Sequence, residues 1–288
     1  MRISRTTKEI RQQLKALRGH QTIALVATMG CLHAGHLSLI KKAREIADIV
    51  VVTIYVNPLQ FGPNEDLDSY PRPFDQDAKL CADADVDFIF NPTNLYHDQR
   101  PKITLHASEL PDCLCGKARP GHFDGVITVV NILFNIIQPT IALFGEKDWQ
   151  QLTIIRRMVR DLQMDIEVLG AETIREHSGL ALSSRNSYLT DDTQQQARVL
   201  SQALILMQEL ALGGESACHK LIHAGMAILK SAAIQPEYLE IRDATSLAPV
   251  TTLTNQTARI FIAAKVGNAR LIDNMPLSPT ILNSETQP

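Results

Sequence analysis

The stretch Met29-Gly30-Cys31-Leu32-His33-Ala34-Gly35-His36 separates an apolar run, Ile23 to Thr28, from an amphipathic run that extends from Leu37 to Ala47. This order predicts a strand, a glycine-containing turn and a helix. Glycine lets the backbone approach a ligand closely, and the N–H groups at the start of a helix favour a phosphate. We therefore expect this stretch to bind a phosphate-bearing ligand.

Two histidines lie in the first turn of the predicted helix. His33 and His36 are three residues apart, so both side chains should lie on one helix face and point toward whatever the helix N-terminus binds. The spacing of Gly30 and Gly35 imitates a P-loop, but His36 and Leu37 stand where that motif has Lys and Ser or Thr. The motif therefore argues against a Walker-type kinase.

The N-terminal part of the chain has the pattern of an α/β fold. The apolar run Ile49 to Val56 does not alternate with polar residues, which is typical of a strand buried on both faces of a parallel sheet. Further candidate strands are Val86–Phe90, Ile103–His106, Thr140–Phe144 and Ile166–Leu169. Strand, helix and strand in this order indicate a βαβ unit, whose ligands bind beyond the carboxyl ends of the strands. We predict a Rossmann-like parallel sheet domain.

The composition changes from Thr190 onward, and we expect the domain boundary near Gly179. Residues 190–212 and 215–231 read as two helices split by a Gly-Gly pair, and three candidate strands follow at Tyr238–Arg242, Arg259–Val266 and Arg270–Ile272. We expect a smaller C-terminal α+β domain that acts as a lid. The predicted domains are 1–178, the catalytic domain, and 179–288, the lid.

The composition is that of a globular protein. The chain has 288 residues, a net charge of -3 and 45% hydrophobic residues, and nothing in this balance points to nucleic acid. The apolar runs are shorter than the roughly 20 residues that cross a bilayer, so we expect no membrane contact. Residues 1–20 have helical spacing and lack the apolar core of a signal peptide, so we expect a surface helix and a cytoplasmic protein.

The five cysteines have no framework spacing. The closest pair, Cys113 and Cys115, is separated by one residue rather than two. We expect reduced structural thiols, with redox and metal roles as the alternatives.

Two segments after the first strands carry polar groups. Asn57 and Gln60 lie in a long proline-rich loop at the predicted ligand edge, and their amides would suit a polar substrate. Asp75 and Asp77 open the next helix, where carboxylates complement the dipole; Mg²⁺ binding is the alternative.

Further on, Arg119 and His122 precede an apolar helix and make a plausible anion site.

A second strand-to-helix junction repeats the layout of the first. The strand ending at Phe144 is followed by Gly145-Glu146-Lys147-Asp148 and then a helix. We expect Lys147 to place an ammonium beside a polyphosphate, Asp148 to cap the helix, and Gln151 to face the ligand. Later in the chain, Ser183-Ser184-Arg185-Asn186 has the composition of a mobile phosphate clamp. Each of these groups could instead be an ordinary solvated side chain or cap.

These motifs carry a resemblance. The H-x-G-H sequence after the first strand resembles the nucleotidyltransferase superfamily of adenylate-forming enzymes. The strings N-P-x-Q-F-G-P-x-E-D with Y-P-R, R-P-G-H-F-x-G-V and S-S-R-N, spread over residues 22–274, resemble the pantothenate synthetase (pantoate–beta-alanine ligase) family more specifically.

The resemblance implies ATP-dependent ligation of pantoate to beta-alanine through a pantoyl-adenylate, with Mg²⁺, in a cytoplasmic homodimer. The catalytic groups would be His33, His36, Lys147 and Arg185, with pantoate between Gln60 and Gln151 and with Asn57 nearby. The implied ATP contacts are Met29, Gly30, Cys31, Leu32, His33, Ala34, Gly35, His36, Gly145, Glu146, Lys147, Asp148, Ile174, Leu182, Ser183, Ser184 and Arg185. The Mg²⁺ ligands are not implied.

Two positions depart from the family pattern. Ala27 replaces a proline before T-M-G, which would loosen the turn, and Ser178 replaces an aspartate before Gly179, so any role of that aspartate is in doubt. Two other functions stay open on the sequence. One is a nucleotidyltransferase with a stable nucleotide conjugate as product, and the other is a non-catalytic nucleotide-binding module.

Overall fold

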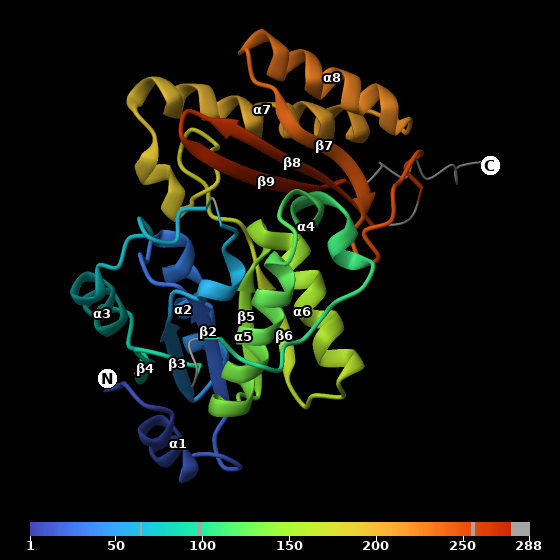
Figure 1. The fold of residues 1–288 in the computed structure, drawn as a ribbon. Helices are drawn as coiled ribbons and strands as arrows, with labels where there is room; N and C mark the ends of the chain where they lie inside the picture. Colours follow the sequence, from blue (N-terminus) through green and yellow to red (C-terminus); the bar gives the residue numbers. More distant parts are fainter. Residues whose placement is uncertain (64, 97–99, 255–256, 278–288) are drawn as a thin grey trace, which may run out of the picture. The chain divides into compact units, whose positions relative to one another are not determined.

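The computed structural model describes residues 1–63, 65–96, 100–254 and 257–277. The chain divides into two compact units, residues 1–174 and residues 175–288 (Figure 1). Each unit has its own sheet, parallel in the first and antiparallel in the second. The predicted Rossmann-like sheet followed by a smaller α+β part is confirmed.

The first unit is built on a parallel sheet with the order β1-β4-β3-β2-β5-β6. Its strands are β1 (Arg2–Ser4), β2 (Ile23–Thr28), β3 (Ile49–Ile54), β4 (Phe88–Phe90), β5 (Ile141–Gly145) and β6 (Glu167–Ala171). The chain moves outward from β2 through β3 to β4 and later returns to β5 on the other side of β2. The direction of winding therefore reverses between β2 and β5, which is where open α/β sheets bind their ligands.

Helices cover both faces of this sheet. The helices of this unit are α1 (Thr7–Lys15), α2 (Ala34–Ile46), α3 (Phe74–Asp83), α4 (Leu114–Ala118), α5 (His122–Ile137) and α6 (Trp149–Asp161). Alternate residues of β2, Ala24 and Val26, share a core with α2 and α3. The intervening β2 residues point to the other face, where α5 contacts the strand and packs against α1 and α6. Both faces of β2 and β3 are buried, which explains their unbroken apolar sequence.

The second unit is a three-stranded antiparallel sheet with two helices. Its elements are α7 (Asp191–Leu212), α8 (Cys218–Ser231), β7 (Pro236–Asp243), β8 (Ala258–Val266) and β9 (Ala269–Leu277). β8 lies in the middle, between β7 and β9. The two helices and the sheet share one apolar core. The predicted elements are present, although β9 is longer than its apolar run suggested.

Two local predictions differ from the structure. The surface helix of residues 1–20 is preceded by the short strand β1, and the helix itself spans only Thr7–Lys15. Residues 103–106 form no strand: Ile103 is 87% exposed, and the N–H of Leu105 donates to a side chain, Thr128 Oγ1, at 3.0 Å. Ala27 lies within β2 and pairs in register with Thr53, as the predicted strand from Ile23 to Thr28 requires.

Among the described residues, no helix is both long enough and apolar enough to cross a bilayer.

A close backbone contact fixes the loop after β3. A Cβ at Gly125 of α5 would lie 2.3 Å from the carbonyl oxygen of Leu59, in the 3-10 helix η1 (Pro58–Gln60). Backbone cannot move aside as a side chain can. The glycine therefore allows α5 to touch the segment that carries Gln60.

We predict that Gly125→Ala lowers the free energy of unfolding by about 1–3 kcal/mol, because the new methyl group overpacks this contact. Urea denaturation measures the change. Gly145→Ala is the matched control, because a Cβ there meets no atom within 4 Å and its φ is -72°. Equal stability of the two variants would contradict the prediction.

Candidate active site

The two histidines of the first junction are locked by the start of α2. His33 occupies the position before the helix, and its ring centroid is 4.1 Å from that of His36. The N–H of Gly35 donates to Nδ1 of His33 at 3.1 Å, and the N–H of His33 donates to Nδ1 of His36 at 3.3 Å. Since Nδ1 accepts in both rings, each neutral imidazole carries its proton on Nε2.

Both imidazoles are neutral at pH 7. Burial, followed by the neighbouring His33, lowers the pKa of His36 to about 3. Burial also lowers the pKa of His33, and the Lys147 ammonium lowers it further. The pair therefore provides N–H donors without net charge.

Contrary to the prediction, the backbone N–H groups of this turn are not available to a phosphate. Several of its N–H groups already donate within the chain, those of Cys31, Leu32, Gly35, His36 and Leu37. The Cys31 and Leu32 groups donate to the carboxylate of Asp77, and the His36 and Leu37 groups donate to the carbonyl of His33. Side chains, rather than these amides, are what this junction offers to a ligand.

The second junction lies beside the first. Lys147 and Asp148 belong to the 3-10 helix η3 (Glu146–Asp148) between β5 and α6, and Lys147 Nζ is 3.7 Å from the Asp148 carboxylate. Besides burial, these two charges act on the pKa of both histidines, Lys147 lowering it and Asp148 raising it. Because β2 and β5 are neighbours in the sheet, the two predicted motifs lie together. The effect of Lys147 and Asp148 on the histidine pKa values agrees with this.

The predicted cap by Asp148 is wrong. Its side chain makes no capping hydrogen bond. A capping residue has extended backbone, whereas Asp148 ends a 3-10 turn with φ -98° and ψ 54°. Its carboxylate is 46% exposed.

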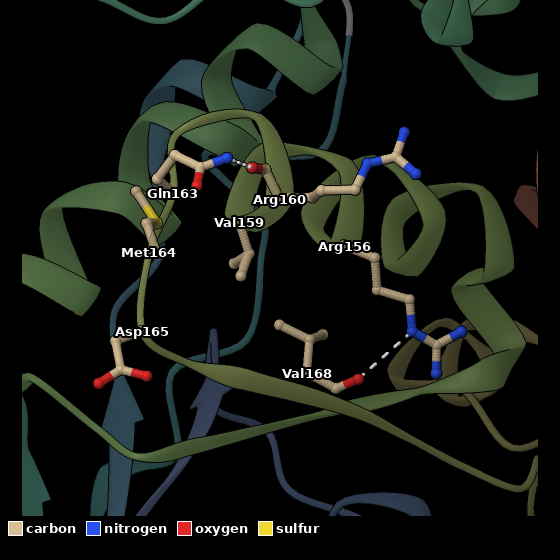
Figure 2. Close-up of a pocket in the computed structure, with 7 residues that line it drawn as sticks. All are labelled: Arg156, Val159, Arg160, Gln163, Met164, Asp165 and Val168. Atoms are coloured by element: carbon tan, nitrogen blue, oxygen red, sulfur yellow. Dashed lines mark hydrogen bonds between the residues drawn. The ribbon is translucent and has the colours of Figure 1, made fainter.

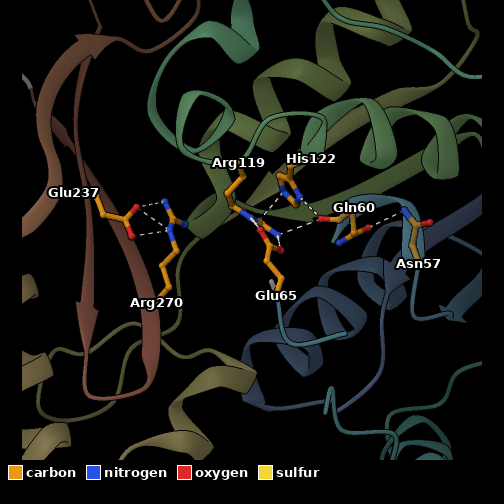
Figure 3. A network of polar contacts seen from close by, with 7 residues as sticks. All are labelled: Asn57, Gln60, Glu65, Arg119, His122, Glu237 and Arg270. Carbon is orange, nitrogen blue, oxygen red and sulfur yellow. Dashed lines mark hydrogen bonds and ion pairs between the residues drawn. The ribbon is translucent and has the colours of Figure 1, made fainter. Parts of the chain in front are cut away.

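Asn57 is saturated by protein contacts. Its Nδ2 donates to Gln60 Oε1 at 3.0 Å (Figure 3). Nδ2 also donates to the Gly125 carbonyl at 3.1 Å, and Oδ1 accepts from the Tyr96 hydroxyl and the Leu59 N–H. The side chain is buried. Asn57 therefore orients Gln60 and has no hydrogen-bonding group left for the substrate contact predicted for it.

Arg119 and His122 are not an open anion site. The Arg119 guanidinium pairs with Glu65 and also donates to Nε2 of His122 at 3.0 Å (Figure 3). His122 Nδ1 in turn donates to the carbonyl of Gln60 at 2.7 Å. Burial, and then the Arg119 charge, lowers the pKa of His122 to about 4, so the ring is neutral. This network anchors the backbone of Gln60.

Neighbouring glutamines at the start of α6 have different environments. Gln150 is buried and its amide contacts Cys115 N–H and the carbonyls of Leu110 and Cys113. Successive helical residues project about 100° apart. Gln151 is half-buried. Its side chain therefore projects in a different direction from that of Gln150, which holds residues 110–115.

The other residues predicted to contact ATP belong partly to the first unit and partly to the second. Gly145 ends β5, Glu146 is in η3, and Ile174 is the last residue of the first unit. In the second unit, Leu182 and Ser183 precede the 3-10 helix η4 (Ser184–Tyr188), which contains Ser184 and Arg185. Ser183 Oγ accepts from the Arg185 N–H at 3.3 Å.

The loop before η4 is held within the second unit. Arg175 forms a two-pronged ion pair with Asp273, at 2.6 and 2.9 Å, and donates to the Gly179 carbonyl. Ser178, the departure from the family pattern, donates to Glu176 at 3.2 Å. On the same unit's sheet, Arg270 pairs with Glu237 (Figure 3).

The first unit has one surface hollow away from the predicted site residues and another beside them. One of about 520 Å³ lies between α6 and β6, is lined by residues such as Arg156, Arg160 and Val168, and contains no candidate residue (Figure 2). Another of about 590 Å³ is bordered by Met29, Gly30 and Asp77. The second is therefore the hollow next to the motif.

The family described as Pantoate-beta-alanine ligase matches residues 2–276. The chain belongs to the pantoate–beta-alanine ligase family. A pantothenate synthetase of Stutzerimonas stutzeri is 45% identical over 96% of this chain and 97% of its own, and one of Shewanella amazonensis is 47% identical over 94% and 97%.

Solved structures of this ligase family agree. The pantothenate synthetase of Thermus thermophilus superposes with a TM-score of 0.90 at 42% identity, covering 96% of this chain and 99% of its own. The pantoate-beta-alanine ligase of Francisella tularensis, complexed with beta-gamma ATP and beta-alanine, has a TM-score of 0.80 at 35% identity, with coverage of 96% and 97%.

The supporting roles of Glu65, Asp77 and Gln150 in this ligase were not predicted from the sequence. Asp77 was considered only as a helix-dipole or metal carboxylate, and its backbone partners lie 45 and 46 residues earlier. The one signal in the sequence was an acidic residue that would lie on the sheet-facing side of α3, where a charge needs partners.

We predict a pH-dependent loss of stability that involves His36. Its imidazole takes up a proton near pH 6.5 in the unfolded chain but only near pH 3 in the folded one. The unfolded state therefore binds more protons between these values, and stability falls as pH falls below about 6.5. From pH 7 to 5 this group should contribute a loss of about 1–2 kcal/mol.

Urea denaturation at the two pH values, compared with His36→Asn, measures this contribution. The variant should lose less stability on acidification than the wild type. His219→Asn, at an exposed position, is the control and should behave as the wild type does. An equal pH dependence in His36→Asn and the wild type would contradict the prediction.

Proposed function

We propose that the protein joins pantoate to beta-alanine in two steps driven by ATP. A carboxylate oxygen of pantoate bonds to the α-phosphorus while the bond to the bridging oxygen breaks, and pyrophosphate leaves with that oxygen. The product is pantoyl-adenylate. The neutral amine of beta-alanine then attacks the acyl carbon, AMP leaves, and the nitrogen loses a proton to give pantothenate.

The observation that carries the proposal is the pair of neutral imidazoles with protonated Nε2 atoms beside Lys147. The first step brings two anions together, so donors and positive charge must stabilise the transition state. His33 and His36 supply N–H groups that are fixed before the reaction, and Lys147 supplies a charge. Fixed donors need no rearrangement as charge develops.

ATP binding extends beyond this pair. We propose contacts from residues 29–36 and 145–148, from Ile174, and from Leu182, Ser183, Ser184 and Arg185 of the second unit. The complex of the Francisella relative with beta-gamma ATP supports a nucleotide site in the family. In this proposal residues 1–178 are catalytic and residues 179–288 act as a lid that excludes water from the mixed anhydride.

Pantoate lies between Gln60 and Gln151 in this proposal. Gln60 Oε1 accepts from Asn57, so the Gln60 Nε2 group is directed by a fixed partner. Asn57 acts through Gln60 rather than by touching pantoate, because its own amide is fully engaged. Beta-alanine is the second substrate, as in the Francisella complex.

We propose that Mg²⁺ arrives with ATP as part of the substrate. Among residues 1–63, 65–96, 100–254 and 257–277, no three His, Cys, Asp or Glu side chains converge to hold a metal ion. Mg²⁺ is commonly held by substrate phosphates and water with one or two carboxylates. In this proposal the phosphates of ATP therefore supply most of the oxygen ligands of Mg²⁺.

The deciding experiment is mass spectrometry of the protein mixed with Mg–ATP and pantoate in the absence of beta-alanine. We expect bound pantoyl-adenylate, and free AMP with pantothenate once beta-alanine is added. A nucleotide conjugate that survives beta-alanine would identify a nucleotidyltransferase instead. Absence of ATP turnover would identify a binding module.

We predict that His36→Ala slows adenylation by ~10²–10³-fold, because one fixed donor to the developing charge is lost. Pantoate-dependent exchange of pyrophosphate into ATP measures this step. His219→Ala, at an exposed position in the second unit, serves as the control. An unchanged exchange rate in His36→Ala would remove the role assigned to this residue.

We predict that Gln60→Ala lowers kcat/KM for pantoate by about 10- to 100-fold, the effect of losing one substrate hydrogen bond and leaving its partner unpaired. The KM for ATP should change less than twofold. Steady-state kinetics with each substrate varied in turn separates the two. A change confined to ATP would place Gln60 elsewhere.

The homodimer and the cytoplasmic location implied by the family belong to the same proposal. Light scattering of the purified protein tests the first, and cell fractionation tests the second.

A further inference from the structure

A buried carboxylate lies directly beneath the turn that leads to the histidines. Asp77 in the first turn of α3 is 1% exposed. Its Oδ2 accepts from the N–H of Cys31 at 2.9 Å, and its Oδ1 accepts from the N–H of Leu32 at 2.7 Å. One carboxylate thus binds two successive backbone donors.

The backbone of the turn is shaped around this carboxylate. Gly30 and Cys31 both have positive φ, 84° and 52°, and a Cβ at Gly30 would lie 2.9 Å from Asp77 Oδ2. Successive N–H groups of a turn that converge in this way form a cavity for an anion. Here the anion is part of the protein. Without it, two N–H groups would lack their acceptor.

The position of this turn determines the position of both imidazoles. His33 follows Leu32 directly, and the backbone N–H of His33 is the donor that fixes His36. A shift of Leu32 would therefore move the His33 N–H and, through it, the ring of His36. The chain of contacts from Asp77 to the two rings involves only adjacent residues and direct hydrogen bonds.

We propose that Asp77 is a positioning residue for adenylation, which holds the Gly30–Leu32 turn so that His33 and His36 present their Nε2–H groups to the triphosphate. In this role Asp77 acts through the backbone of the turn rather than on a substrate. Both of its oxygens face backbone donors, which distinguishes this role from that of a metal ligand. The inference rests on the proposed function, because it assigns a part in its first step.

Asp77→Asn is the test variant. Asparagine keeps the shape but has one oxygen and an NH₂ group. The NH₂ group cannot accept from a backbone N–H, so one of the two contacts is lost. Asp83→Asn is the matched control, because Asp83 is an exposed carboxylate on the same helix.

The experiment measures pantoate-dependent exchange of pyrophosphate into ATP, with pantoate and ATP each varied up to saturation. We expect Asp77→Asn to lower kcat by about 10- to 100-fold, as misplaced catalytic groups do, with the KM values for pantoate and ATP within about twofold of wild type. Asp83→Asn should match the wild type. The nitrogen NMR signals that report the imidazole tautomers of His33 and His36 should change only in Asp77→Asn.

Three outcomes would overturn the inference. Asp77→Asn could match Asp83→Asn in kcat. Its activity could return with a raised Mg²⁺ concentration, which would make Asp77 a metal ligand. Its histidine signals could stay unchanged while activity falls. If the wild type itself catalyses no exchange, the proposed function fails instead, and the two failures are thus distinct.

A measurement on the wild type covers the case in which Asp77→Asn does not fold. Hydrogen exchange should be slow at the amides of Cys31 and Leu32 in the protein without ligands, because Asp77 binds them there. Exchange as fast as at the exposed residues of α3 would show that the contact is not maintained, and would overturn the inference.

Discussion

The parallel pairing of β2 with β5 is the constraint on which the rest of the site depends. Leu25 lies in register with Ala142, so the two strands end side by side. The turn to α2 follows one strand and the 3-10 helix η3 follows the other. Two imidazoles and one ammonium meet only because the sheet reverses its winding between these strands.

Charge at this meeting point is lower than the count of basic residues suggests. The histidines are neutral because they are buried beside a lysine, and their acceptor nitrogens are occupied by backbone N–H groups. Arg119 is neutralised by Glu65 and acts on the loop that carries Gln60. The site thus offers neutral imidazole N–H groups as donors and carries few net charges.

The sequence predicted the helices and strands that local periodicity determines. β2, α2 and the order of βα units follow from apolar runs and helical spacing. The family motifs identified the candidate residues. The Asp77 contacts and the Glu65–Arg119 pair could not be predicted, since they join residues 45 to 54 positions apart. β1 was missed because three residues carry no period, and the Asp148 cap failed because a 3-10 turn precedes α6.

The orientation of the two imidazoles has a consequence for water. In both rings the basic nitrogen, Nδ1, accepts from the backbone, and only the acidic N–H side is left for a ligand. A water molecule that reaches these rings can accept a hydrogen bond from them but cannot give up its proton to them. The pair that would assist formation of a reactive anhydride is therefore unable to act as a general base for its hydrolysis.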